Sequence, residues 1–158
     1  MSVLKLGDVD TVKGVFQTFA EADEVWLQSR SLLSDHSSPQ LAIAHLKLFC
    51  PELVSYREGW FLASGFDEAA ADVWFSQPNV SVSGVEAILN HLHLSYMFGD
   101  TEVVRMTDDE AIAFGQLLSF QWKIWAQNVY SLHIETYLST IPGDVQIWFE
   151  SRGVFGND

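Results

Sequence analysis

The residues best suited to chemistry by type and spacing are two of the five histidines, His91 and His93, in the segment NHLHL. Imidazole nitrogens bind transition metals and transfer protons near neutral pH. A metal requires both rings on one side of the backbone, and an i, i+2 spacing gives that arrangement only on a strand. The surrounding sequence predicts a helix, in which the two rings would point about 200° apart. His91 and His93 are therefore weak metal candidates, and we predict no metal and no cofactor.

Carboxylate pairs that resemble the acid–base pairs of hydrolases occur throughout the chain, which has 21 acidic residues. Most of them fall at predicted helix starts or exposed turns, where helix capping, the helix dipole and solvation account for an acid. The densest group, within residues 100–110, has five acids and one base: Asp100, Glu102, Asp108, Asp109 and Glu110, with Arg105. This segment is the best candidate for a surface that faces a basic partner.

Other catalytic and cofactor-binding signals do not occur in the sequence. The glycine patterns of phosphate-binding loops and the G-x-S-x-G motif of serine hydrolases are both absent. Cys50 is the only cysteine, so no intrachain disulfide can form. Its apolar neighbours favour a small buried hydrophobe over a nucleophile. The sequence therefore favours a protein without catalytic activity.

The six tryptophans are a large number for this length, and two of them are candidates for a binding surface. Trp122 and Trp125 lie in a predicted core helix. Trp60 lies on a predicted hairpin, and Trp148 follows Ile147 on the last predicted strand, so it points away from the buried face of that strand. Exposed aromatic residues beside acids are typical of protein-binding surfaces. We therefore predict Trp60 and Trp148 as aromatic anchors for a partner.

The elements that must position these residues are organised around one helix, predicted over about residues 108–129. Thr107 and Glu110 have the spacing of a capping box, and three acids in the first turn suit the positive end of the helix dipole. Beyond this turn, Lys123 is the only charged residue before Glu135, apart from His133. Apolar residues recur on two adjacent stripes, which is typical of a core helix that is contacted from more than one side.

Turn and capping signals delimit the other elements. Ser83 and Glu86 have capping-box spacing, Pro142-Gly143 marks a turn, and residues 145–150 alternate between apolar and polar. The predicted elements are a helix from residue 8 or 10 to about 33 (with a strand over 12–19 as the alternative), a helix over 40–49, a hairpin over 52–64, a helix over 66–75, a helix from Ser83 to about Phe98 and a closing hairpin over 131–150.

Together these elements predict a single α+β domain over residues 1–158, with the central helix packed on the antiparallel hairpins over 52–64 and 131–150. Residues 1–7 read as a short extended arm and residues 153–158 as a frayed tail. At 158 residues the chain is long enough to bury a core without disulfides.

The strongest global signal is the formal net charge of −13 at pH 7, with eight Lys and Arg residues scattered singly. Without a basic stripe, direct binding to nucleic acid or to an anionic membrane is not expected. No segment reaches membrane-spanning length and no leader is evident, so we expect a cytoplasmic protein.

Three functions are compatible with this pattern. The favoured one is an acidic, non-enzymatic binding protein of the inhibitor, immunity or adaptor type, which docks on the basic surface of a protein partner. The second is a subunit of a larger assembly, or a homodimer, held by apolar contacts. The third is a small enzyme or ligand binder that uses His91 or His93 with a nearby carboxylate.

Overall fold

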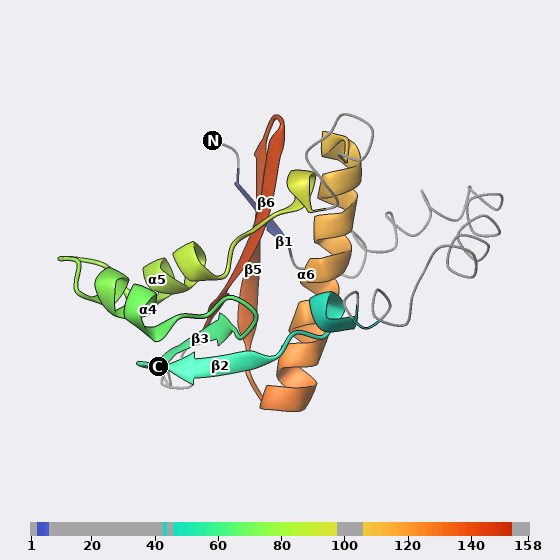
Figure 1. The fold of residues 1–158 in the computed structure, drawn as a ribbon. Helices are drawn as coiled ribbons and strands as arrows, with labels where there is room; N and C mark the ends of the chain where they lie inside the picture. Colours follow the sequence, from blue (N-terminus) through green and yellow to red (C-terminus); the bar gives the residue numbers. More distant parts are fainter. Residues whose placement is uncertain (1–2, 7–42, 44–45, 98–105, 153–158) are drawn as a thin grey trace.

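Two antiparallel sheets, with helices packed on them, form the part of the chain that the computed structural model describes: residues 3–6 (backbone only), 43, 46–97 and 106–152. In Figure 1 the long β5–β6 hairpin has α6 along one side and α4 and α5 on the other. The elements are β1 (Val3–Leu6), β2 (Leu53–Tyr56), β3 (Gly59–Leu62), α4 (Glu68–Phe75), α5 (Val82–Leu89), β4 (Leu92–His93), the 3₁₀ helix η1 (Leu94–Tyr96), α6 (Asp108–Tyr130), β5 (Ile134–Ile141) and β6 (Asp144–Ser151). The predicted α+β class, with a central helix on antiparallel hairpins, is confirmed.

The larger sheet has the strand order β1-β5-β6-β4, and all of its pairs are antiparallel. Its centre is the predicted closing hairpin, in which Tyr137 lies opposite Trp148. Gly143 in the turn has φ of 78°, a left-handed conformation that favours glycine. Part of the predicted N-terminal arm is strand β1, in which Val3 lies opposite Ser139 of β5. The hairpin therefore receives an edge strand from each side.

The smaller sheet is the predicted first hairpin, β2–β3. Its turn residues, Arg57 and Glu58, have φ of 46° and 69°. Residues other than Gly, Asn and Asp seldom adopt this left-handed backbone conformation. Arg57 forms an ion pair with Asp72 of α4 at 2.9 Å and lies over the rings of Tyr56 and Phe75. These contacts join the turn to α4 and stabilise an otherwise unfavourable backbone.

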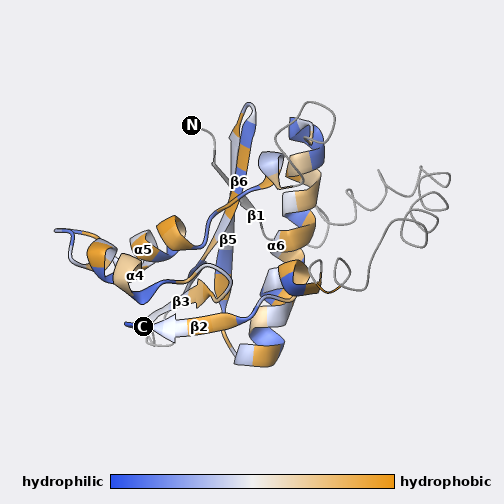
Figure 2. Ribbon diagram, viewed as in Figure 1, coloured by the Kyte–Doolittle hydropathy of each residue, from blue (hydrophilic) through white to orange (hydrophobic). Residues whose placement is uncertain are grey.

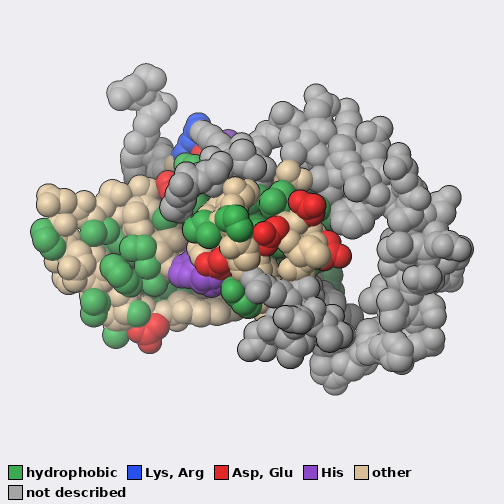
Figure 3. Space-filling model, turned by 90° about the horizontal axis from the view of Figure 1, so that it is seen from above, with side chains coloured by type: hydrophobic (Ala, Val, Ile, Leu, Met, Phe, Trp, Pro, Cys, Tyr) green, Lys and Arg blue, Asp and Glu red, His purple; other side chains and the backbone are tan. Residues whose placement is uncertain are grey.

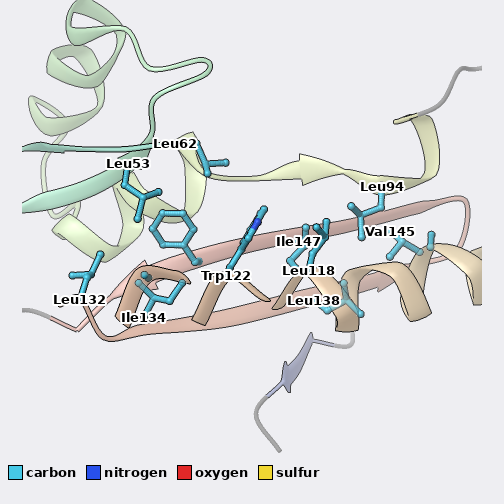
Figure 4. Packing of buried hydrophobic residues seen from close by; sticks show 13 residues of the cluster. Leu53, Leu62, Leu94, Leu118, Trp122, Leu132, Ile134, Leu138, Val145 and Ile147 are labelled. Atoms are coloured by element: carbon cyan, nitrogen blue, oxygen red, sulfur yellow. The ribbon is translucent and has the colours of Figure 1, made fainter. Parts of the chain in front are cut away.

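Helix α6 begins as predicted, with a capping box between Thr107 and Glu110. Its first turn is hydrophilic, and hydrophobic residues follow along the helix (Figure 2). Trp122 is buried with its ring edge-on to Phe149 of β6, and its Nε1 donates to the Leu48 carbonyl. The half-buried Trp125 donates in the same way to the Pro51 carbonyl. Figure 4 shows the core between α6 and the β5–β6 hairpin, where the apolar faces of helix and strands meet.

Gly115 allows α6 to approach β5 and η1 closely. A Cβ atom on Gly115 would lie 2.5 Å from Leu138 Cδ1 and 2.8 Å from Leu94 Cδ1, closer than van der Waals contact permits. Leu138 and Leu94 are both completely buried. The missing side chain therefore lets these two leucines fill the space against the helix backbone.

Two buried polar side chains join β3 to β6: Glu86 of α5 and Asn90, the C-cap residue one turn further along. Glu86 accepts hydrogen bonds from Trp60 N at 2.8 Å, from Ser151 N at 2.9 Å and from Ser151 Oγ. Asn90 accepts from Leu62 N at 3.0 Å and donates to the carbonyls of Trp60 at 2.9 Å and Phe149 at 3.3 Å. This α5 bridge, defined as Glu86 and Asn90, satisfies backbone groups on facing edges of two sheets that do not pair directly.

The α5 bridge explains why two predictions for this region were wrong. The N-cap of the helix is Ser81, two residues before the predicted Ser83, and the Ser81 side chain accepts from Gly84 N. Glu86 faces the sheets instead of closing a capping box with Ser83. The helix also ends at Leu89 rather than near Phe98, because the chain then pairs with β6, Leu92 lying opposite Ile147. Long-range hydrogen bonds outweigh the local signals here.

Other predictions agree with the structure or fall outside the described residues. The helix predicted over 66–75 corresponds to α4, with Asp67 as N-cap. Residues 43 and 46–49 of the helix predicted over 40–49 are helical. The predicted N-terminal helix and the tail over 153–158 lie outside the described residues. Within the described ranges, no helix combines the length and the apolar character needed to cross a membrane.

Candidate functional site

The first turn of α6, the β5–β6 turn and β4 lie together at one end of the molecule. Both carboxylate oxygens of Asp108 accept a hydrogen bond from Gly143 N, at 3.0 and 3.1 Å, which fixes the helix start to the turn. Figure 3 looks down on this end and shows Asp and Glu side chains, a histidine cluster and hydrophobic side chains among the described residues. We call it the acid–histidine end, defined by Asp108, Asp109, Glu110, Asp144, His91 and His93.

The three acids of the α6 first turn, which the sequence predicted as binding residues, have different local roles. Asp108 is half-buried and bonded to the β5–β6 turn, while Asp109 and Glu110 are exposed. Glu110 accepts from Thr107 N at 2.8 Å, and this backbone hydrogen bond lowers the pKa of its carboxyl. Asp109 is therefore the acid of this turn whose charge can be changed with the least effect on the fold.

His91 and His93 lie on extended chain, so the prediction that they point apart on a helix was wrong. His93 belongs to β4, opposite Gln146 of β6, and His91 follows Asn90, the C-cap of α5. Their ring centroids are 5.1 Å apart with an interplanar angle of 77°. The helix ends before them because Asn90 turns toward the sheets, and the two imidazoles are thereby brought together.

Each of these histidines has one defined partner for its Nδ1 atom. His93 Nδ1 donates to Asp144 Oδ1 at 2.7 Å, and Asp144 Oδ2 in turn accepts from Gln146 Nε2 at 2.6 Å. His91 Nδ1 donates to the Ile88 carbonyl, one of the carbonyls left without a helical partner at the end of α5. The carboxylate beside His93 is that of Asp144, the first residue of β6, which directly follows the predicted turn at Pro142-Gly143.

Exposed apolar side chains accompany the acids at this end. Tyr96 is 43% exposed and its ring centroid lies 6.4 Å from that of His93. Ile141, the last residue of β5, is 38% exposed beside the turn that Asp108 holds. Large apolar groups framed by charges are typical of surfaces that bind other proteins.

The predicted anchor Trp148 lies on a different surface, the outer face of the β5–β6 hairpin. Val145, Ile147 and Phe149 are buried, and Trp148 stacks on Tyr137 across the strands, with ring centroids 5.6 Å apart. Trp148 Nε1 donates to Glu150 at 3.4 Å. Burial raises the pKa of the Tyr137 hydroxyl, and the charges of Glu150 and Glu135 raise it further. This aromatic pair is half-buried and flanked by acids.

Of the remaining predicted binding residues, Trp60 joins neither surface and the other two fall outside the described residues. Trp60 packs against the core, edge-on to Tyr130 with ring centroids 5.9 Å apart. Asp100 and Glu102 lie outside the described residues. Cys50 is half-buried, and its Sγ accepts from Gln121 Nε2 at 3.7 Å. Among the described residues, the predicted aromatic anchors Trp60 and Trp148 therefore lie apart from the predicted acids of the α6 first turn.

Two further observations limit what the site can be. In the part of the chain that the structure describes, no three His, Cys, Asp or Glu side chains are grouped so that they could hold a metal ion. No protein-family model, curated protein or solved structure matches this chain. The function is therefore inferred from the geometry of these residues alone.

Proposed function

We propose that the protein is a non-enzymatic binding protein that docks a basic segment of a partner protein on its acid–histidine end. The observation that carries this proposal is the joint placement of Asp108, Asp109, Glu110 and Asp144 beside the exposed side chains of Tyr96 and Ile141. Acids attract and orient a basic partner, and apolar side chains contribute contact area once it has docked.

The charge of the whole chain supports the same partner chemistry. With a net charge of −13, long-range attraction speeds encounters with basic proteins and disfavours acidic ones. Asp108 is held by the β5–β6 turn, Glu110 by its capping box and Asp144 by His93 and Gln146, so three of the four carboxylates have fixed positions. Fixed acids lose less conformational entropy when a Lys or Arg side chain binds to them.

The test begins with selection of peptides that bind the full-length protein from a random display library at low salt. We expect enrichment of Lys and Arg, and we expect the association rate of a selected peptide to fall steeply as NaCl is added. In the Asp109→Lys variant, association should be severalfold slower and its salt dependence weaker. Stopped-flow fluorescence measures both quantities.

The matched control is Glu68→Lys, because Glu68 is also an exposed acid in the first turn of a helix, α4. Both variants change the net charge equally, so only a local effect distinguishes them. Equal association rates and salt slopes in the two variants would show that the acid–histidine end is not the docking site. Selection of peptides without excess positive charge would contradict the proposed partner chemistry.

A second candidate function, a subunit of a larger assembly or a homodimer, is favoured by exposed apolar residues on α4. Val73 is 59% exposed and Trp74 is 39% exposed on this helix. Light scattering over a range of concentrations tests the homodimer: a Val73→Ser/Trp74→Ser variant should dissociate at concentrations where the native protein is dimeric. A native protein that stays monomeric at high concentration would exclude it.

A further inference from the structure

We propose that His91 and His93 form a two-imidazole binding site for a divalent transition metal of the Zn²⁺, Cu²⁺ or Ni²⁺ class, with solvent water as the remaining ligands. This inference goes beyond the proposed docking function and does not depend on it. It rests on the hydrogen bonds of the two rings, on the distance between their centroids and on the Asp144 carboxylate that is bonded to His93.

The hydrogen bonds of the rings determine which nitrogens are available to a metal. A carbonyl and a carboxylate only accept hydrogen bonds, so the Nδ1 atoms that contact Ile88 O and Asp144 Oδ1 must carry the protons. In each neutral ring, Nε2 is then unprotonated and has a lone pair. Among the described residues, neither Nε2 atom has a hydrogen-bond partner that would compete for it.

The separation of the ring centroids is compatible with two ligands of a single metal. A Zn–N bond is about 2.0–2.1 Å long and the ring centre lies about 1.2 Å beyond the nitrogen, so two imidazoles in a tetrahedral site have centroids about 5 Å apart. The observed separation of the His91 and His93 centroids is 5.1 Å. The backbone holds this spacing, since β4 pairs with β6 and Asn90 is bonded to the sheets.

The hydrogen-bond acceptors at the two Nδ1 atoms are of the kinds that metal-binding histidines usually have. Such histidines donate their second ring N–H to a carboxylate or to a backbone carbonyl, which fixes the tautomer and makes the other nitrogen more basic. His93 has the carboxylate, Asp144, which Gln146 holds at 2.6 Å, and His91 has the Ile88 carbonyl. Imidazole nitrogens select Zn²⁺, Cu²⁺ and Ni²⁺ over Mg²⁺ and Ca²⁺, which prefer oxygen.

Calorimetric titration of the full-length protein with ZnCl₂ in excess Mg²⁺ tests the site, because Mg²⁺ occupies the many surface carboxylates without displacing metal from imidazole. We expect saturable binding of one Zn²⁺ per chain. His91→Ala and His93→Ala should each weaken binding by about 10-fold or more, and Asp144→Asn should weaken it by about 10–100-fold through loss of the supporting carboxylate. In ¹⁵N spectra of the imidazoles, Zn²⁺ should shift Nε2 of both residues.

The control variant is His133→Ala, which removes an exposed imidazole beside a different carboxylate, Glu135, 3.9 Å away. It should bind Zn²⁺ as the native protein does, and thermal unfolding should show that all four variants are folded. Absence of saturable binding to the native protein would overturn the proposal. So would unchanged affinity in both His91→Ala and His93→Ala, or shifts at Nδ1 in place of Nε2.

Discussion

At the scale of single residues, the least expected finding is a carboxyl group in the interior. Glu86 is completely buried, yet it accepts from two backbone N–H groups and one hydroxyl on different sheets. Burial raises the pKa of its carboxyl, and the hydrogen bonds from Ser151 and Trp60 oppose the shift without cancelling it. Burying a carboxyl group costs desolvation free energy, and here the hydrogen bonds from Trp60 N and from Ser151 N and Oγ offset that cost.

The raised pKa of Glu86 predicts how its contribution to stability depends on pH. Its ordinary value is 4.5, so above that pH the folded protein binds more protons at this site than the unfolded chain does. The contribution of Glu86 to the free energy of unfolding should therefore be complete below pH 4.5 and fall as the pH rises through the raised pKa. Urea unfolding of the native protein and of Glu86→Gln across this range measures the difference.

The Glu86→Gln variant serves as the reference because it cannot titrate at this position while the other 20 acids still do (21 minus one). The difference in unfolding free energy between the two proteins should decrease toward higher pH. A difference that stays constant, or that increases with pH, would contradict the assigned direction of the pKa shift.

At the scale of elements, the contact between α6 and the β5–β6 hairpin depends on a residue without a side chain. Alanine is the better helix former by up to about 1 kcal/mol, so local propensity favours Gly115→Ala. Packing opposes it, because the new methyl group would overlap Leu138 and Leu94, which are buried and cannot move into solvent.

We therefore expect Gly115→Ala to lower the free energy of unfolding by about 1–3 kcal/mol, the usual cost of overpacking a core. Gly65→Ala is the control, since no heavy atom of the described residues lies within 4 Å of its Cβ position. Equilibrium urea unfolding compares the two variants. Increased stability in Gly115→Ala would show that the helix and the hairpin can separate more easily than their packing indicates.

At the scale of the whole molecule, charge is the dominant property. The net charge of −13 makes the folded chain repel itself. In the part of the chain that the structure describes, Arg57 pairs with Asp72 at 2.9 Å, and Arg152 with Glu135 at 2.5 Å. Both side chains of the first pair are about half exposed, and exposed pairs contribute little to stability; in the second pair the Glu135 side chain is largely buried. The same excess charge is what would attract a basic partner to the acid–histidine end.

Salt should accordingly stabilise the fold. Raising NaCl from about 10 mM to about 150 mM shortens the screening length from about 30 Å to about 8 Å, which weakens repulsion across the molecule. We expect the midpoint of thermal unfolding at pH 7 to rise over this range, as measured by circular dichroism. A falling midpoint would mean that ion pairs such as Arg57–Asp72 outweigh the net repulsion.

The sequence by itself determined the elements whose signals are local. The capping box of Thr107 and Glu110 begins α6, and the alternation after Pro142-Gly143 both forms β6 and directs Trp148 away from the buried face. These predictions succeeded because a cap, a turn and an alternating strand depend on neighbours within a few residues. The α+β class followed from the order of these elements.

Only the tertiary structure decided where α5 begins and ends and where the histidines point. Glu86 and Ser83 have the spacing of a cap, but Glu86 serves backbone donors at Trp60 and Ser151, which are far away in sequence. Asn90 ends the helix in the same way, and His91 and His93 then meet on extended chain beside Asp144. Local periodicity cannot reveal such partners, because the free energy of a buried hydrogen bond depends on groups that only the folded chain brings together.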